Sequence, residues 1–346
     1  MKKQSRQEKT NALKTLESAI FEIMLFEEIS KHNFQALMEM LPEYVKVLMG
    51  AESVEVLYDD IGKHNGICIE DKVVLNERFL KMPETEMAKI EQIFSVLKTS
   101  THEVMHALDK KENAFSQSQR AFIEHKANGI KTFAKFCPQK KASYELLAEA
   151  LYAIDRSEVF ARQGAIKICK VFLDELLNYS AQNVDVTLQK KKDYDAFCKF
   201  QTMVNGQTTD VPMPKIAPES FGYILAKIKL AKAKDIVYIQ EAHETNTMLS
   251  AIALKEKYLK SFKEDLKTFT TSALKRKPKA LDETALIDLA LTQEIEGVFD
   301  AETVQNLLTL SKKCGFKYGE NLCQALQKTE SQKAIKQDSM NIKENC

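Results

Sequence analysis

The sequence predicts an α+β fold in which helix dominates, and three observations support this fold class. Apolar residues recur at helical spacing over most of the chain. Three short runs with strand propensity stand together between residues 54 and 76. The composition, 44% apolar and 29% charged, is typical of a soluble protein rich in exposed helices. With 346 residues the chain is too long for one small core, so we expect two or three structural units.

The strands are expected in three runs, Val54–Tyr58, Gly66–Glu70 and Lys72–Asn76. A glycine-bounded segment separates the first two, and a short acidic corner separates the last two. We therefore expect a small antiparallel or mixed sheet.

Helical patterns flank this sheet and divide the chain into five expected regions. A helix from Asn33 to Leu48 is interrupted by Pro42, and a cluster of three prolines indicates a linker before lysine-rich helices. The regions are an N-terminal helical region (1–50), a core with the small sheet (51–180), a linker (181–220), a helical C-terminal domain (221–327) and a polar tail expected to be disordered (328–346).

The segment His102-Glu-Val-Met-His106 lies in a long helical pattern that begins after Pro83. Residues four apart lie on one face of a helix, so both imidazoles can reach one ion. Glu103 projects about a quarter-turn away, where it can take a proton from a water on that ion. The spacing therefore predicts a single catalytic zinc ion, with Glu103 as the general base.

A catalytic zinc needs a third protein ligand, and Glu158 is the best candidate. Its helical face is otherwise apolar or small, and coordination would remove the cost of burying a lone carboxylate. The alternative is a solvent-facing Glu158 paired with Arg162 one turn later. The face comprises Ile154, Glu158, Ala161, Ala165, Ile168 and Phe172, and the competing ligands are Glu124, His125, Glu145 and Glu149.

The pattern His102-Glu-Val-Met-His-Ala-Leu-Asp109, followed by Ser157-Glu-Val-Phe-Ala161, resembles the zincin metalloproteases of the gluzincin type. It is similar to the catalytic domain of anthrax lethal factor and to zincin-like domains of phage and mobile-element proteins. The resemblance covers roughly residues 51–180. It implies an edge strand before the signature helix that binds an extended peptide. The substrate-binding residues would then be Val73, Val74, Leu75 and Asn76.

Two positions depart from that family pattern. Met105 stands where many zincins have glycine, and Arg162 stands where thermolysin-like enzymes have an aspartate. We expect Asp109, one turn after His106, to act as the carboxylate that orients a ligand. Tyr152, six residues before Glu158, is the candidate for stabilising the oxyanion, with a buried core tyrosine as the alternative.

Other signals exclude several classes of function. The net charge is +1, so nothing demands nucleic acid. Seven scattered cysteines without a C-x-x-C pair indicate no disulfide framework. His243-Glu244 repeats half of the zinc signature, but Thr247 stands where the second histidine would be. No run is long and apolar enough for a transmembrane helix and no signal peptide is recognised, so we expect a cytoplasmic protein, although export by a specialised system stays open.

The leading prediction is a zinc-dependent endopeptidase acting on a protein or peptide. Two alternatives remain. One is a non-catalytic interaction protein that keeps a zincin-like scaffold and binds a partner through its C-terminal helices. The other is a metal-dependent hydrolase of a non-peptide amide.

Overall fold

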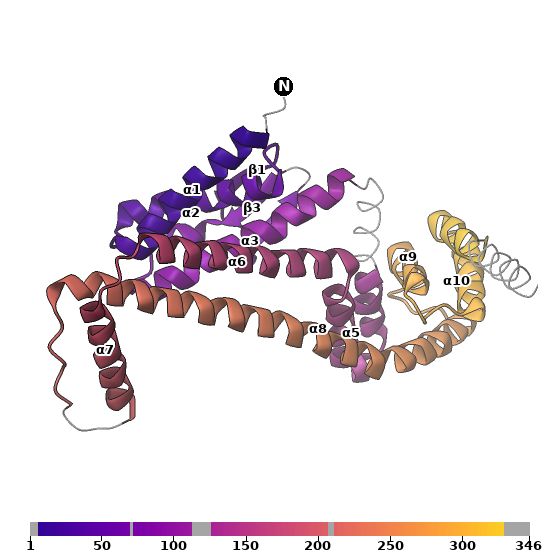
Figure 1. Cartoon of the computed structure of the whole chain (residues 1–346). Helices are drawn as coiled ribbons and strands as arrows, with labels where there is room; N and C mark the ends of the chain where they lie inside the picture. The colour runs from indigo at the N-terminus through magenta and orange to yellow at the C-terminus, as the bar shows by residue number, and fades with distance from the viewer. Residues whose placement is uncertain (1–5, 70–71, 113–125, 207–210, 329–346) are drawn as a thin grey trace, which may run out of the picture. The chain divides into compact units, whose positions relative to one another are not determined.

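The computed structural model describes residues 6–69, 72–112, 126–206 and 211–328 (Figure 1). The chain divides into two compact units, each built from two segments. The first unit comprises Met1–Glu112 and Phe160–Glu244, and the second comprises Asn113–Val159 and Thr245–Cys346. These units are discontinuous in sequence, which differs from the consecutive regions that the sequence predicts.

The first unit combines helices with one small sheet. Its elements are α1 (Arg6–Phe26), α2 (Lys31–Met49), β1 (Glu55–Asp59), β2 (Gly66–Ile69), β3 (Lys72–Asn76), a 3-10 turn (Glu77–Leu80), α3 (Glu86–Glu112), most of α6 (Arg156–Asn183), α7 (Leu188–Gly206), a second 3-10 turn (Pro218–Ser220) and the first part of α8 (Phe221–Lys275).

The sheet is mixed, and its strand order is β1-β3-β2. β1 pairs with β3 in parallel, and β2 pairs with β3 antiparallel, with Gly66 opposite Leu75. The fold is therefore predominantly helical with a small mixed sheet, as the sequence predicts at this level. The expectation that β3 is an edge strand is wrong, because both of its hydrogen-bonding edges are occupied by neighbouring strands.

The substrate-binding role expected for β3 has no support in its side chains. Val73 and Leu75 are fully buried in the core, and Val74 is half-buried between two paired strands. The amide of Asn76 donates to the carbonyl oxygens of Gly62 and His64, at 2.9 and 2.7 Å. These residues build the sheet and the loop beside it.

Helix α2 continues through Pro42, where the sequence predicts an interruption. A proline has no N–H, so the carbonyl of Met38 one turn earlier loses its helical donor. The hydroxyl of Tyr58 on β1 donates to that carbonyl at 2.7 Å. The sheet thus supplies the hydrogen bond that the helix lacks, and the helix remains unbroken.

Phe172 on α6 lies at the centre of the core of the first unit. Its ring makes edge-to-face contacts with Phe21, Tyr44 and Phe94, with centroids 5.1, 5.4 and 5.6 Å apart. Such contacts add to the burial of apolar area. Because those three rings come from α1, α2 and α3, α6 is packed against the helix that carries the zinc signature.

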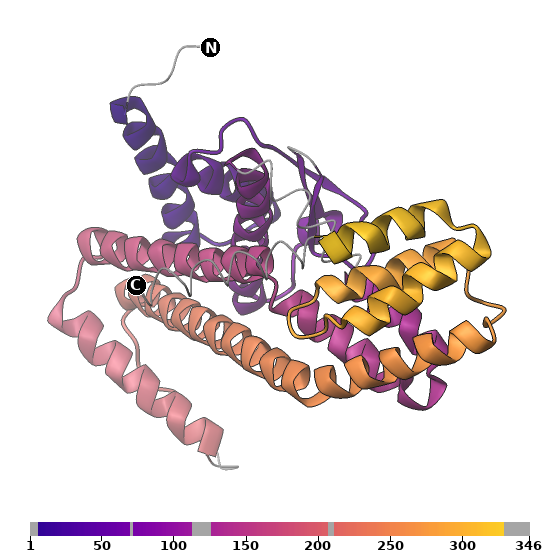
Figure 2. The same ribbon diagram turned by 90° about the vertical axis from the view of Figure 1, so that its right-hand side faces the viewer.

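The described part of the second unit contains helices and connecting turns but no strand (Figure 2), and its buried apolar side chains form a core of their own. Phe133 at its centre packs against Tyr144, Phe262 and Phe269. Its elements are helical residues 126–136, a 3-10 turn (Pro138–Lys140), α5 (Lys141–Ala153), the rest of α8, α9 (Glu283–Leu291), a 3-10 turn (Thr292–Glu294), α10 (Ala301–Cys314) and helical residues 317–328.

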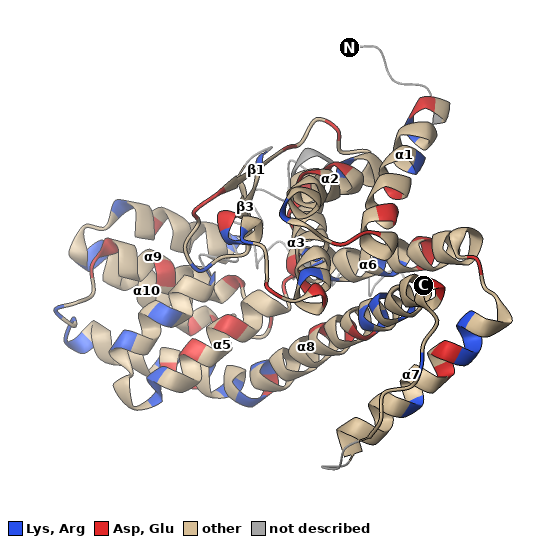
Figure 3. Ribbon diagram, turned by 90° about the vertical axis from the view of Figure 1, so that its left-hand side faces the viewer, with Lys and Arg blue, Asp and Glu red and all other residues tan. Residues whose placement is uncertain are grey.

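Two sequence expectations for the C-terminal half need correction. The region 181–220 is not a plain linker, because it contains α7, and the carboxylate of Asp193 accepts hydrogen bonds from Ser220 and the amide of Ala217 at 2.6 and 3.1 Å. The sequence predicts separate helices at Phe221–Ala233 and Glu241–Thr271, but these form one continuous helix of 55 residues, α8. Both α7 and α8 carry acidic as well as basic residues (Figure 3).

No helix in the described part of the chain is long and apolar enough to cross a membrane. The tail expected at 328–346 lies almost wholly outside the described residues.

Candidate metal centre

Helix α3 carries both histidines of the signature in its C-terminal half. Their Nε2 atoms lie 3.0 Å apart, and the two rings are nearly perpendicular, at 89°. Two imidazoles bound to one tetrahedral zinc ion at the usual bond length place their nitrogens about 3.3 Å apart. His106 is buried and His102 is half-buried. The pair is therefore already close to the geometry that a shared ion requires.

Glu158 supplies the third potential ligand from the first turn of α6. One ligand atom each from His102, His106 and Glu158 lies within 4.8 Å of the others. The boundary between the two units falls directly after Val159, one residue after Glu158, inside this same helix.

The donor set fits a transition-metal ion. Glu158 is only 6% exposed, so the solvent-facing alternative is wrong. Two imidazoles and one carboxylate are a zinc-binding set that leaves a fourth position open. The hydroxyl of Tyr152 at the end of α5 donates to Glu158 Oε1 at 3.2 Å. Tyr152 itself is 41% exposed, which contradicts the buried core tyrosine considered above.

Small residues on α6 allow it to approach the signature helix closely. Ala161 and Ala165 are completely buried. A Cβ atom placed on Gly164 would meet Met105 Cε at 2.4 Å. The methionine that replaces the usual glycine of the signature is thus accommodated by a glycine on the facing helix.

Glu103 is buried beneath the start of β2. Its Oε1 lies 4.0 Å from His102 Nε2, close enough for one water molecule to contact the carboxylate and an ion on the imidazoles. A Cβ atom on Gly66 would lie 2.9 Å from Glu103 Cγ and 2.7 Å from Thr99 Cγ2. Gly66 pairs with Leu75 and lies on the face of the sheet that packs on α3, so only a residue without a side chain fits there.

The remaining sequence candidates have separate outcomes. Asp109 is half-buried on α3, three residues after His106, and its orienting role stays a prediction. Glu149 is exposed, and Glu145 pairs with Lys141 at 3.8 Å. Among the described residues, the metal-ligating cluster contains neither of them. Glu124 and His125 lie outside the described residues.

Sequence reasoning missed two residues that the structure brings to this region. Gly66 was considered only as a strand boundary, and Glu244 only as half of an incomplete zinc signature. Gly66 lies against Glu103 of α3, and Glu244 pairs with Lys98 of α3. Neither spacing nor periodicity along the chain could relate them to α3, because both contacts form between segments that are distant in sequence.

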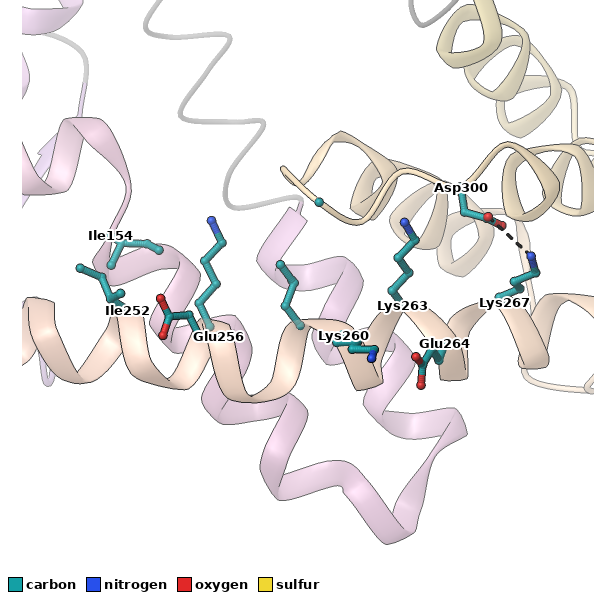
Figure 4. A pocket seen from close by; sticks show the side chains of 11 residues that line it. Ile154, Ile252, Glu256, Lys260, Lys263, Glu264, Lys267 and Asp300 are labelled. Carbon is teal, nitrogen blue, oxygen red and sulfur yellow. Dashed lines mark ion pairs between the residues drawn. The ribbon is translucent and has the colours of Figure 1, made fainter.

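The second unit contains a groove of about 700 Å³ along α8. Figure 4 shows Lys263 and Lys267 on the side of α8 that faces Asp300. Lys267 pairs with Asp300 at 3.6 Å and with Glu302 at 2.6 Å. Lys255 pairs with Glu296 at 3.6 Å. Acidic groups thus match much of the lysine charge, and the expectation of a partner for these helices stays a prediction.

Comparison with protein-family models, with curated proteins and with solved structures finds no significant match to this chain. The resemblance to zincins therefore stays a prediction from the two sequence motifs.

Proposed function

We propose that this protein is a zinc-dependent endopeptidase. The observation that carries the proposal is the convergence of His102, His106 and the buried Glu158, with Glu103 beside them. Structural clusters of acids and histidines are common, but this one combines three ligands with a carboxylate that suits a general base. A buried acid on an otherwise apolar face has a clear physical reason to be there if it binds a metal ion.

His102, His106 and Glu158 would hold the ion, which when bound lowers the pKa of a water molecule to about 7 and polarises a carbonyl group. Glu103 accepts the proton of the attacking water and passes it to the leaving amine. The hydroxyl of Tyr152 is within hydrogen-bond reach of Glu158. It is partly exposed, so it can turn to donate to a developing oxyanion.

The substrate strand that we propose lies along the outer edge of β2, in place of β3. β2 has one strand neighbour among the described residues, β3. Its first residue, Gly66, packs directly over Glu103. An extended peptide added to that edge would run past the general base, with main-chain hydrogen bonds providing affinity.

The Glu103→Gln variant tests the proposal. It should bind zinc as the wild type does and lose at least about 100-fold in cleavage of a quenched fluorescent peptide library, because a general base contributes about that much or more. The Glu158→Gln variant should instead lose zinc affinity. Glu149→Gln, which changes an exposed glutamate, is the matched control and should alter neither property.

The alternatives give different outcomes in the same experiment. A wild-type protein that binds no zinc would favour the interaction protein with a zincin-like scaffold. Zinc binding with hydrolysis of small amides but not of peptides would favour the non-peptide hydrolase. Full peptidase activity in Glu103→Gln would refute the assigned mechanism.

A further inference from the structure

We propose that Glu244 is a positioning residue that sets the register between the two helices carrying the zinc ligands. The proposal rests on the zinc site proposed above. It concerns a residue of α8 that is not a member of the candidate ligand cluster and that contacts both ligand helices.

The carboxylate of Glu244 forms ion pairs with one residue of α3 and one residue of α6. Its Oε1 lies 2.6 Å from Lys98 Nζ, and its Oε2 lies 3.5 Å from Arg162 Nη1. Each carboxylate oxygen therefore serves a different helix. All three residues belong to the first unit.

The two anchored residues stand in the same relation to the zinc ligands. Lys98 precedes His102 by four residues on α3, and Arg162 follows Glu158 by four residues on α6. Four residues are about one turn, or about 6 Å along a helix axis. In two antiparallel helices, a bridge that joins Lys98 to Arg162 also aligns His102 with Glu158. The contact to Glu244 thus fixes the alignment that the cluster requires, one turn away from it.

The environment of Glu244 makes this bridge stronger than an ordinary surface pair. The Glu244 side chain is 14% exposed, whereas both members of the neighbouring pair between Lys170 and Glu241 are more than 40% exposed. Burial acts to raise the pKa of Glu244, but the hydrogen bond and charge of Lys98, with the charge of Arg162, outweigh it and hold the pKa below its usual value. Surface pairs contribute little, while a half-buried, charge-assisted bridge resists displacement.

Register affects only one of the three ligands. His102 and His106 are four residues apart on α3, so their relation depends on that helix alone. Glu158 comes from another helix, and a slip of α6 along α3 would remove it from the ion. A defect in register should therefore be visible only while Glu158 is available as a ligand.

A double-mutant cycle in zinc affinity uses this difference. We would measure the zinc dissociation constant, by competition with a fluorescent chelator, for wild type, Glu244→Gln, Glu158→Gln and the double variant. Glutamine has no charge, and an NH₂ donor replaces one of its two acceptor oxygens, so it cannot keep the two ion pairs that Oε1 and Oε2 of Glu244 make with Lys98 and Arg162. The expected loss on Glu244→Gln is about 10- to 100-fold in the wild-type background, as for other groups that orient metal ligands.

The same substitution should change zinc affinity by less than about 3-fold in the Glu158→Gln background, where only the histidine pair remains. Equal losses in both backgrounds would show a general electrostatic or structural effect and would overturn the proposal. No loss in either background would overturn it as well. The matched control is Glu241→Gln, which breaks the exposed pair with Lys170 three residues away on α8 and should leave zinc affinity unchanged.

A second variant covers the case in which Glu244→Gln does not fold, as judged by circular dichroism and thermal unfolding. Lys98→Met removes the ion pair between α3 and Glu244 with little change in side-chain shape. Its loss of zinc affinity should also appear only when Glu158 is present. If the wild type binds zinc but the losses in zinc affinity caused by Glu244→Gln and Glu158→Gln are additive, only the positioning role is refuted. Absence of zinc binding in the wild type refutes the proposed function and the positioning role together.

Discussion

Replacing Gly66 by alanine should misplace the general base without disturbing the metal ligands. The three nearest atoms to the new methyl group belong to Thr99 and Glu103, at 2.7, 2.9 and 3.4 Å. Gly66 is not among the glycines with positive φ. The backbone there accepts alanine, and the effect must come from the contact itself.

The size of the effect follows from these distances. Glu103 Cγ must retreat by about 0.5 Å to reach ordinary van der Waals contact, and Thr99 Cγ2 by somewhat more. A misplacement of about 1 Å at a catalytic group costs about 100-fold in rate. We therefore expect kcat/KM to fall about 10- to 100-fold. Overpacking should lower the free energy of unfolding by about 1 to 3 kcal/mol.

The assay combines peptide cleavage, zinc titration and thermal unfolding on Gly66→Ala. Zinc affinity should stay within about 3-fold of wild type, because the three atoms nearest to the new methyl group belong to neither His102 nor His106. Gly222→Ala is the matched control, since nothing lies within 4 Å of its added Cβ. Wild-type activity in Gly66→Ala would refute the reasoning, and so would a loss of zinc affinity equal to the loss of activity.

A second substitution should partly rescue the first. Thr99→Ser removes the methyl group that the new side chain meets at the shortest distance, so the alanine methyl group of the double variant can shift away from Glu103. Activity should recover by about 3-fold or more over Gly66→Ala. If Thr99→Ser leaves the loss unchanged, the contact with Thr99 does not contribute to it.

Three further predictions concern the ligand shell and stability. Tyr152→Phe should lower kcat about 100-fold while zinc affinity falls less than about 10-fold; unchanged peptide cleavage would exclude an oxyanion role. Burial acts to raise the pKa of Glu86, but hydrogen bonds and charges of Lys89 and Lys229 outweigh it and hold the pKa below its usual value. The stability that this group contributes is therefore present above about pH 5 and is lost as pH falls through its folded pKa. Glu86→Gln should lower the free energy of unfolding by about 2 kcal/mol at pH 7. In denaturant titrations at several pH values, the stability of this variant should fall less between pH 7 and low pH than that of wild type. The same pH dependence in both proteins would contradict this contribution of Glu86. When the free zinc concentration is 100 times the dissociation constant, bound zinc should raise the free energy of unfolding by about 2.7 kcal/mol, and a chelator should remove this gain. An identical melting temperature with zinc and with chelator would show that no ion stabilises the fold.

The features closest to the signature could be predicted from the sequence because they depend on local patterns. The helix of His102 and His106 follows from a long apolar period, and the burial of Glu158 follows from the small and apolar residues that share its face. In each case the residues that determine the structure lie within a few turns of the feature.

Strand order is a different kind of property. The apolar run of β3 predicts a strand, but nothing in it states which strands lie on either side, and parallel pairing with β1 joins residues far apart in the chain. The length of α8 was missed for a related reason. Its polar stretches indicate helix ends when read alone, although packing in both units keeps the helix continuous.

The contacts of Gly66 and Glu244 show the same limit at the site itself. Gly66 approaches Glu103 across the sheet and helix, and Glu244 joins two helices whose contacting residues precede it by more than 80 positions. Only the folded chain relates these residues to the zinc ligands. What the sequence could predict was the set of candidate ligands, and what it could not predict was the set of contacts that Gly66 and Glu244 make around them.

X-ray absorption at the zinc edge, on protein loaded with one equivalent of zinc, tests the central claim most directly. The zinc site proposed here predicts nitrogen and oxygen ligands at about 2.0 to 2.2 Å with the multiple-scattering pattern of two imidazoles. Glu158→Gln should change the oxygen shell and keep both imidazoles. A sulfur shell at about 2.3 Å, the absence of imidazole scattering, or failure to bind one equivalent of zinc would contradict the account.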